Sequence, residues 1–245
     1  MVIPLALEGG LIRERSLQAV FFDLADTLAY LWVPKSQRFP FLCKMAGLVA
    51  SSDAAAEAGR LTFLRTWSGE EPGPVEGSLG WRGGLGAYRA GLVAMGCEDA
   101  DAGAKVLADA ARRLPFSIYP DPGAAHLLAL LKQHGLRLGV LSNHRGTLRE
   151  NLLALDLLPY CDVVLDSHLT GIRKPDPEIF LMACEAAHVP PDKAAFVGGE
   201  PLSDVAGARQ ADLLPILLDP AGIFPPPNGA EVTVASLSDL KRVFF

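Results

Sequence analysis

The stretch that decides the fold is Ala19-Val20-Phe21-Phe22-Asp23-Leu24-Ala25-Asp26-Thr27-Leu28. Its first four residues are apolar and predict a buried strand, which breaks off at Asp23 into a short polar turn. Open α/β sheets bind ligands beyond the carboxyl ends of their strands. We therefore expect Asp23 to stand at the edge of the sheet where chemistry takes place.

Strands and helices alternate along the C-terminal half of the chain. The expected strands are Leu136–Leu141, Val163–Leu165, Ala194–Val197, Leu214–Leu218 and a weak one at Glu231–Val234. The expected helices are Gly123–His134, Thr147–Leu155, Asp204–Gln210 and one that begins at Asp176-Pro177 and runs to about Ala187. This alternation predicts an α/β fold, a Rossmann-like parallel sheet covered by helices on both faces.

The stretch between the first strand and this alternating half lacks strand patterns. Apolar residues recur at helical spacing in Phe41–Val49, Ala54–Trp67, Leu85–Met95 and Ala104–Leu114. Between them, Ser68–Gly84 is rich in Gly and Pro and reads as an irregular linker. We predict a core domain of residues 1–33 and 116–245, with an all-helical cap domain of residues 34–115 inserted into it.

Composition narrows the classes of partner. The net charge is −6 and the isoelectric point is near 5.4, which argues against a nucleic-acid or anionic-membrane surface. No apolar stretch approaches the ~20 residues of a spanning helix, and the short apolar start before Glu8 does not resemble a signal peptide. The widely spaced cysteines are expected to be reduced thiols: Cys43, Cys97, Cys161 and Cys184. We expect a cytoplasmic protein.

Four short segments follow predicted strands in a fixed order. They are Phe22–Leu28, Ser142-Asn143, Gly171–Phe180 and Val197–Ala208. Together they resemble the motifs of the haloacid dehalogenase-like (HAD) hydrolase superfamily, in the subgroup with a helical, C1-type cap. The resemblance covers about Ala19 to Leu218, and it implies a hydrolase with an aspartyl nucleophile and a small anionic, phosphorylated substrate.

The resemblance gives each motif residue a role with a physical reason. Asp23 would be the nucleophile, because a carboxylate can split a hydrolysis into two displacements. Lys174 would neutralise the substrate beside Asp23, while Ser142 and Asn143 would bind substrate oxygens. Thr27 would orient the Asp23 loop through its hydroxyl. Asp204 would hold a divalent cation or fix Lys174.

The first and fourth motifs depart from the family pattern. The second Asp, the usual proton donor of phosphatases, is Ala25, and Asp26 stands at the usual Gly position. The fourth motif normally begins Gly-Asp, but here it reads Gly198-Gly199. We therefore expect weak binding of Mg²⁺ through Asp23, the carbonyl of Ala25 and Asp204. Glu200 is an alternative ligand.

Three interpretations remain open at this stage. The first is a phosphate-ester hydrolase with a modified site, and the second is a metal-independent 2-haloacid dehalogenase. The second lacks the Ser-Ser-Asn of that branch's fourth motif, and its cap arginine would have to be one of Arg38, Arg60 and Arg65. The third is a non-catalytic binding or regulatory protein on a HAD scaffold.

Overall fold

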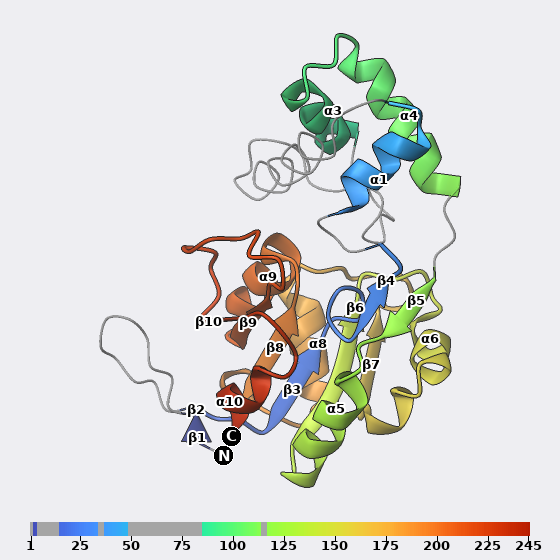
Figure 1. Cartoon of the computed structure of the whole chain (residues 1–245). Helices are drawn as coiled ribbons and strands as arrows, with labels where there is room; N and C mark the ends of the chain where they lie inside the picture. The colour runs from blue at the N-terminus through green and yellow to red at the C-terminus, as the bar shows by residue number, and fades with distance from the viewer. Residues whose placement is uncertain (1, 4–14, 34–36, 49–84, 114–116) are drawn as a thin grey trace. The chain divides into compact units, whose positions relative to one another are not determined.

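The computed structural model describes residues 2–3, 15–33, 37–48, 85–113 and 117–245 (Figure 1). The chain divides into two compact units: Met1–Ala29 with Tyr119–Phe245, and Tyr30–Ile118. The sequence placed these boundaries after residue 33 and before residue 116. The expected helix Ala54–Trp67, the linker Ser68–Gly84 and the candidates Arg60 and Arg65 lie outside the described residues.

A six-stranded sheet forms the centre of the first unit, in the order β10-β9-β8-β3-β6-β7 (Figure 1). Every neighbouring pair is parallel. The strands are β3 (Ala19–Phe22), β6 (Arg137–Ser142), β7 (Val163–Asp166), β8 (Ala194–Gly198), β9 (Leu214–Leu218) and β10 (Val232–Val234). Helices flank the sheet, which confirms the predicted α/β, Rossmann-like fold.

The central strand β3 is buried at all four positions. Phe22 pairs in register with Val140 on one side and Val197 on the other, as expected of a sheet covered on both faces. The Asp23 N–H donates to the Val197 carbonyl at 2.9 Å, so pairing continues one residue past the strand. Phe196 packs edge-on against Phe180 with ring centroids 4.9 Å apart. This packing holds Asp23 at the carboxyl edge of the sheet.

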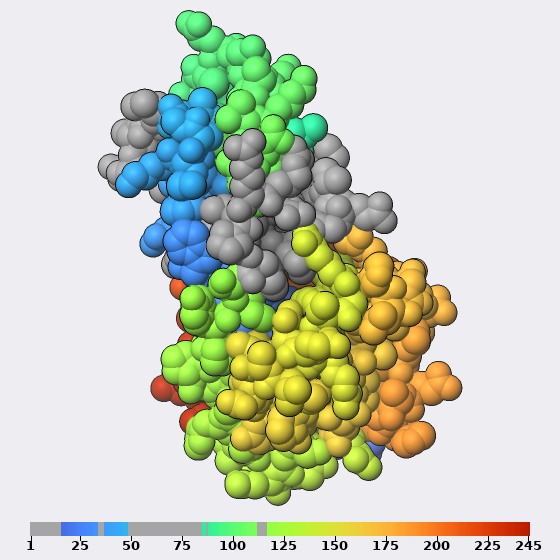
Figure 2. Space-filling view, turned by 90° about the vertical axis from the view of Figure 1, so that its right-hand side faces the viewer, coloured from blue at the N-terminus to red at the C-terminus, as the bar shows by residue number. Residues whose placement is uncertain are grey.

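Three of the flanking helices agree closely with spans that the sequence predicted, namely Gly123–His134, Thr147–Leu155 and Asp176 to about Ala187. The helix at Ser167–Thr170 was not predicted. The flanking helices follow one another along the chain. They are α5 (Ala124–Gln133), α6 (Leu148–Ala154), α7 (Ser167–Thr170), α8 (Pro177–Ala187), α9 (Ala206–Gln210) and α10 (Leu240–Phe244). Asp176 caps α8, because its carboxylate accepts the Glu178 N–H at 3.0 Å. In Figure 2, the yellow-green segment around α5 and α6 lies beside the orange segment around α8.

The helix expected over Asp204–Gln210 begins differently. The segment Pro201–Val205 forms one π-helical turn, and regular α-helix starts only at Ala206. The Asp204 carboxylate folds back onto the Glu200 N–H at 3.0 Å, which satisfies a backbone donor at the start of this turn. A π-turn of this kind often occurs at functional sites.

Helices make up most of the described part of the second unit. It contains α1 (Arg38–Met45), α3 (Leu85–Ala94) and α4 (Ala100–Arg113). Leu42, Leu92 and Leu107 lie in its buried cluster. Two short strands that the sequence did not predict, β4 (Ala29–Leu31) and β5 (Ile118–Pro120), pair where the chain passes between the units. The role of this unit as a cap stays a prediction.

In the first unit, β1 (Val2–Ile3) and β2 (Arg15–Ser16) also pair antiparallel, as a separate two-stranded sheet. None of the four cysteines forms a disulfide, and two of them, Cys43 and Cys184, are buried. Within the described ranges, no helix has the length and apolar character needed to span a membrane.

Candidate active site

Asp23 opens a tight turn at the end of β3. The Leu24 carbonyl accepts the N–H groups of Thr27, Leu28 and Ala29 at 2.9 to 3.3 Å, which folds the chain back at once. Within this turn Asp26 has φ of 60°, a left-handed conformation that Asp tolerates better than most residues. The turn therefore fixes the backbone that carries Asp23.

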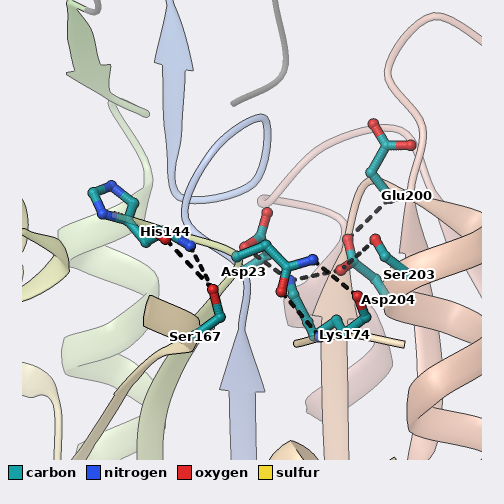
Figure 3. A network of polar contacts seen from close by, with 8 residues as sticks. Asp23, His144, Ser167, Lys174, Glu200, Ser203 and Asp204 are labelled. Carbon is teal, nitrogen blue, oxygen red and sulfur yellow. Dashed lines mark hydrogen bonds and ion pairs between the residues drawn. The ribbon is translucent and has the colours of Figure 1, made fainter. Parts of the chain in front are cut away.

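Lys174 lies between two carboxylates (Figure 3). Its Nζ is 2.9 Å from Asp23 Oδ1 and 2.7 Å from Asp204 Oδ1. Asp23, Lys174 and Asp204 are all buried, with 8%, 4% and 1% of their surface exposed. The ammonium also lies 5.1 Å from the centroid of the Phe196 ring. The structure thus brings together one positive and two negative groups, with a formal sum of −1 when all are ionised.

Burial and neighbouring charges shift the pKa values of Asp23 and Lys174. Burial raises the pKa of the Asp23 carboxyl from 3.8 to about 6, with Lys174 opposing the increase and Asp204 adding to it. Burial alone lowers the pKa of Lys174, but attraction to Asp204 and Asp23 outweighs burial and leaves the pKa above 10.5. Lys174 therefore remains a cation at physiological pH, while Asp23 titrates at about pH 6, close to the physiological range. Perturbed groups of this kind cluster at functional sites.

Asp204 is held from three sides. Besides Lys174, its Oδ1 accepts the Ser203 hydroxyl at 3.2 Å, and its Oδ2 accepts the Glu200 N–H at 3.0 Å. A Cβ at Gly198 would collide with the Asp204 carboxyl group, so glycine is required there by close approach. Figure 3 shows the Glu200 carboxylate pointing away from Lys174.

Asn143 contacts the backbone of Lys174. Its Nδ2 donates to the Lys174 carbonyl, and its Oδ1 accepts the Lys174 N–H, both at 2.9 Å. The preceding residue, Ser142, ends β6 beside β3 and is 3% exposed. The predicted role of Ser142 in substrate binding stays a prediction.

Two further candidates from the sequence, Thr27 and Arg38, have buried side chains. Thr27 is fully buried, and its hydroxyl has no hydrogen-bond partner among the described residues. Its role in orienting the Asp23 loop stays a prediction. Arg38 is buried, and its Nε donates to the Val33 carbonyl at 3.1 Å.

Sequence reasoning missed a polar network behind Asn143. The Asp166 carboxylate accepts the N–H groups of Gly146, Leu148 and His168 at 2.8 to 3.1 Å. His144 places Nδ1 3.5 Å from Asp166 and Nε2 3.1 Å from Asn151 Nδ2, and burial keeps the pKa of this imidazole below 6.5. The signal that could have found it is Asp166, which follows a predicted strand as Asp23 does.

A divalent cation would meet an incomplete set of ligands. Within the residues that the structure describes, no three His, Cys, Asp or Glu side chains gather as a metal site. Asp23 and Asp204 nevertheless face one point, the ammonium of Lys174. Two carboxylates suit Mg²⁺, which usually takes one or two from the protein and completes its shell with substrate oxygens and water. The donor chemistry therefore fits Mg²⁺, with fewer acids than the family pattern has.

Comparison with known proteins identifies the family and the fold. Residues 17–212 match the family model of the haloacid dehalogenase-like hydrolases. A phosphoserine phosphatase from Thermus thermophilus is 38% identical over 133 residues, about half of each protein at 54% of this chain and 52% of that one. Haloacid dehalogenase-like hydrolase domain-containing protein 3 from Xenopus laevis is 28% identical over 217 residues, covering 84% of this chain and 85% of that protein. The crystal structure of a HAD phosphatase from Thermococcus onnurineus aligns with a TM-score of 0.58 at 23% identity, over 93% and 98% of the two chains, and shares the fold.

Proposed function

The chain belongs to the haloacid dehalogenase-like hydrolase family, and we propose that it hydrolyses small phosphate monoesters with Asp23 as the nucleophile. The observation that carries this proposal is the pair of contacts from Lys174 Nζ, 2.9 Å to Asp23 and 2.7 Å to Asp204. A buried cation beside a carboxylate at a sheet edge suits an anionic substrate, because it offsets the charge of substrate and nucleophile together. The similarity to phosphoserine phosphatase supports a phosphorylated substrate.

The reaction would proceed in two displacements. The Asp23 carboxylate attacks phosphorus, the P–O bond to the ester oxygen breaks, and an aspartyl phosphate forms. Water then attacks this acyl phosphate, releasing inorganic phosphate and regenerating Asp23. Lys174 and Ser142 would hold the phosphoryl oxygens. Because Ala25 has no proton to give, the leaving oxygen takes its proton from solvent.

Mg²⁺ belongs to this proposal as a weakly bound cofactor. Asp23, the carbonyl of Ala25 and Asp204 would hold it, and it would supply positive charge at the phosphoryl oxygens. Lys174 already contacts both carboxylates, so a bound cation must share them. Gly199 removes one acid from the family pattern, which is why we expect weak affinity.

The test is hydrolysis of p-nitrophenyl phosphate and of an alkyl phosphate, each with and without Mg²⁺. Without a proton donor at Ala25, the aryl ester should react roughly 100-fold faster or more, because general acid catalysis normally contributes this much. Asp23→Asn should abolish both activities. No turnover of either ester with any divalent cation would contradict the proposal, and chloride release from a 2-haloacid would then favour a dehalogenase.

A further inference from the structure

Lys174 is a loop residue whose position must be set by something other than regular structure. It lies between α7 and α8, in a stretch without helix or strand. Lysine has a long, flexible side chain, so a small shift of its backbone can move the ammonium. Nevertheless the ammonium contacts both Asp23 and Asp204 below 3 Å. The backbone contacts of Lys174 are therefore informative.

The Asn143 amide provides these contacts. One oxygen and one nitrogen of a single side chain bond the N–H and the carbonyl of the same residue, both at 2.9 Å, across 31 positions of sequence. A reciprocal pair of this kind fixes both the position and the orientation of the Lys174 peptide groups. The amide oxygen and one amide hydrogen are thus engaged within the protein.

Asn143 is itself held on both sides. Ser142 precedes it as the last residue of β6. The next residue, His144, donates its N–H to Ser167 Oγ at 3.1 Å. Its ring lies between Asp166 and Asn151. Buried, mutually bonded polar groups are rigid, so this network gives the Asn143 amide a fixed base on the sheet.

We propose that Asn143 is a positioning residue that places the Lys174 ammonium against Asp23, instead of a group that binds substrate. The expected effect on kcat rests on the proposed function, whereas the expected shift of the Lys174 ammonium does not depend on any substrate. Coulomb attraction falls with distance, so releasing the Lys174 backbone should weaken the anion site through Lys174 alone.

A double-mutant cycle tests this with inorganic phosphate as the probe, measured by calorimetry. Asn143→Ala should weaken phosphate binding about tenfold when Lys174 is present, comparable to one charge-assisted hydrogen bond. In a Lys174→Met background, Asn143→Ala should cause no further loss. An equal loss in both backgrounds would mean that Asn143 contacts the anion itself. The kcat should also fall more than KM rises.

A crystal structure of Asn143→Ala gives a readout that needs no ligand. We expect the Lys174 ammonium to leave hydrogen-bond distance of Asp23 or Asp204. Asn143→Asp, which has nearly the same shape and keeps the acceptor for the Lys174 N–H, should shift it less, and it serves if the alanine variant does not fold. The matched control is Asn228→Ala, which removes a buried amide bonded to Phe224 and Thr233 elsewhere in the same unit.

The two readouts separate the two proposals. If the wild type neither binds phosphate nor hydrolyses esters, the proposed function fails, while the crystal structures still decide the role of Asn143. If Lys174 Nζ stays within hydrogen-bond distance of both carboxylates in both Asn143 variants, the positioning role is wrong.

Discussion

A side chain at Gly199 would begin 3.1 Å from the carbonyl oxygen of Asp26 and 3.8 Å from its Cβ. The motifs that the sequence resembles imply an acid at the position of Gly199 and a glycine at that of Asp26, so relative to them this chain exchanges the two residue types. A Cβ at 3.1 Å from a backbone oxygen is tight. An acid at position 199 would therefore add a negative charge and would also crowd the Asp26 backbone.

Gly199→Asp alone should destabilise the protein in the absence of metal, by about 1–3 kcal/mol as expected for overpacking. In the presence of Mg²⁺ the new carboxylate should bind the cation and stabilise the fold by mass action. Adding Asp26→Gly leaves the backbone carbonyl in place, but glycine adopts the left-handed φ of 60° without strain and lets this backbone shift away from the new side chain more easily. The double variant should thus show the larger increase in melting temperature with Mg²⁺.

The control for this pair is Asp26→Gly by itself, which frees the loop without adding a ligand. If the wild type, Gly199→Asp and the double variant all respond to Mg²⁺ in the same way, the metal does not bind where we propose. The phosphatase proposal would then lose its cofactor site.

Asp23→Asn should change how stability depends on pH. The pKa of Asp23 is about 6 in the folded protein against 3.8 ordinarily. The folded state favours the protonated Asp23 carboxyl. The contribution of this group to folding stability is therefore fully present below pH 3.8 and is lost as pH rises through about 6. Asparagine does not ionise, so the stability of the variant relative to the wild type should increase across this window, by about 3 kcal/mol. Urea unfolding at both ends of the window measures the difference.

Asp162→Asn provides a control of opposite sign. Burial alone would raise the pKa of Asp162, but bonds from Lys132 and from the Leu138 N–H hold it below 3.8. Its stabilisation is present above pH 3.8 and lost as pH falls through the lower folded value. Asp162→Asn should therefore be less stable than the wild type at neutral pH. If Asp23→Asn were also less stable than the wild type at neutral pH relative to low pH, then burial would not raise the pKa of Asp23.

The pH profile of activity should report the same group. A nucleophilic carboxylate must be ionised, so kcat/KM should fall on the acid side with an apparent pKa of about 6. For an unperturbed Asp the fall would occur near 3.8. Steady-state rates on p-nitrophenyl phosphate across this range make the measurement, and an acid limb near 3.8 would refute the buried, raised carboxyl.

Lys174→Met should be far more destabilising than Lys132→Met. The first leaves Asp23 and Asp204 facing each other while buried, a loss of about 3–5 kcal/mol for breaking a buried pair. The second removes the ion pair of Lys132 with Asp162. The Lys132 side chain is 35% exposed, and ion pairs of exposed side chains contribute about 1 kcal/mol or less. Urea denaturation compares the two. Equal losses would indicate that the triad at the sheet edge is not charged as we describe.

Local patterns in the sequence were sufficient for most of the fold. The apolar run ending at Phe22 predicted the buried central strand, and Asp176-Pro177 predicted the start of α8. Both signals lie within a few neighbouring residues, so periodicity and capping chemistry reveal them. The π-turn before Ala206 was missed, because it depends on a bond between the Asp204 side chain and the Glu200 N–H.

The sequence was enough to predict that Asp23, Ser142, Lys174 and Asp204 lie at one edge of a parallel sheet, because the carboxyl ends of parallel strands share one edge. The contacts of the Lys174 ammonium with two carboxylates, at 2.9 and 2.7 Å, became visible only in the folded chain. The folded chain alone shows that Asn143 bonds the Lys174 backbone and that Gly199 lies against Asp26. These contacts join loops that are distant in sequence, and their distances follow from how whole strands and helices pack, which no local pattern encodes.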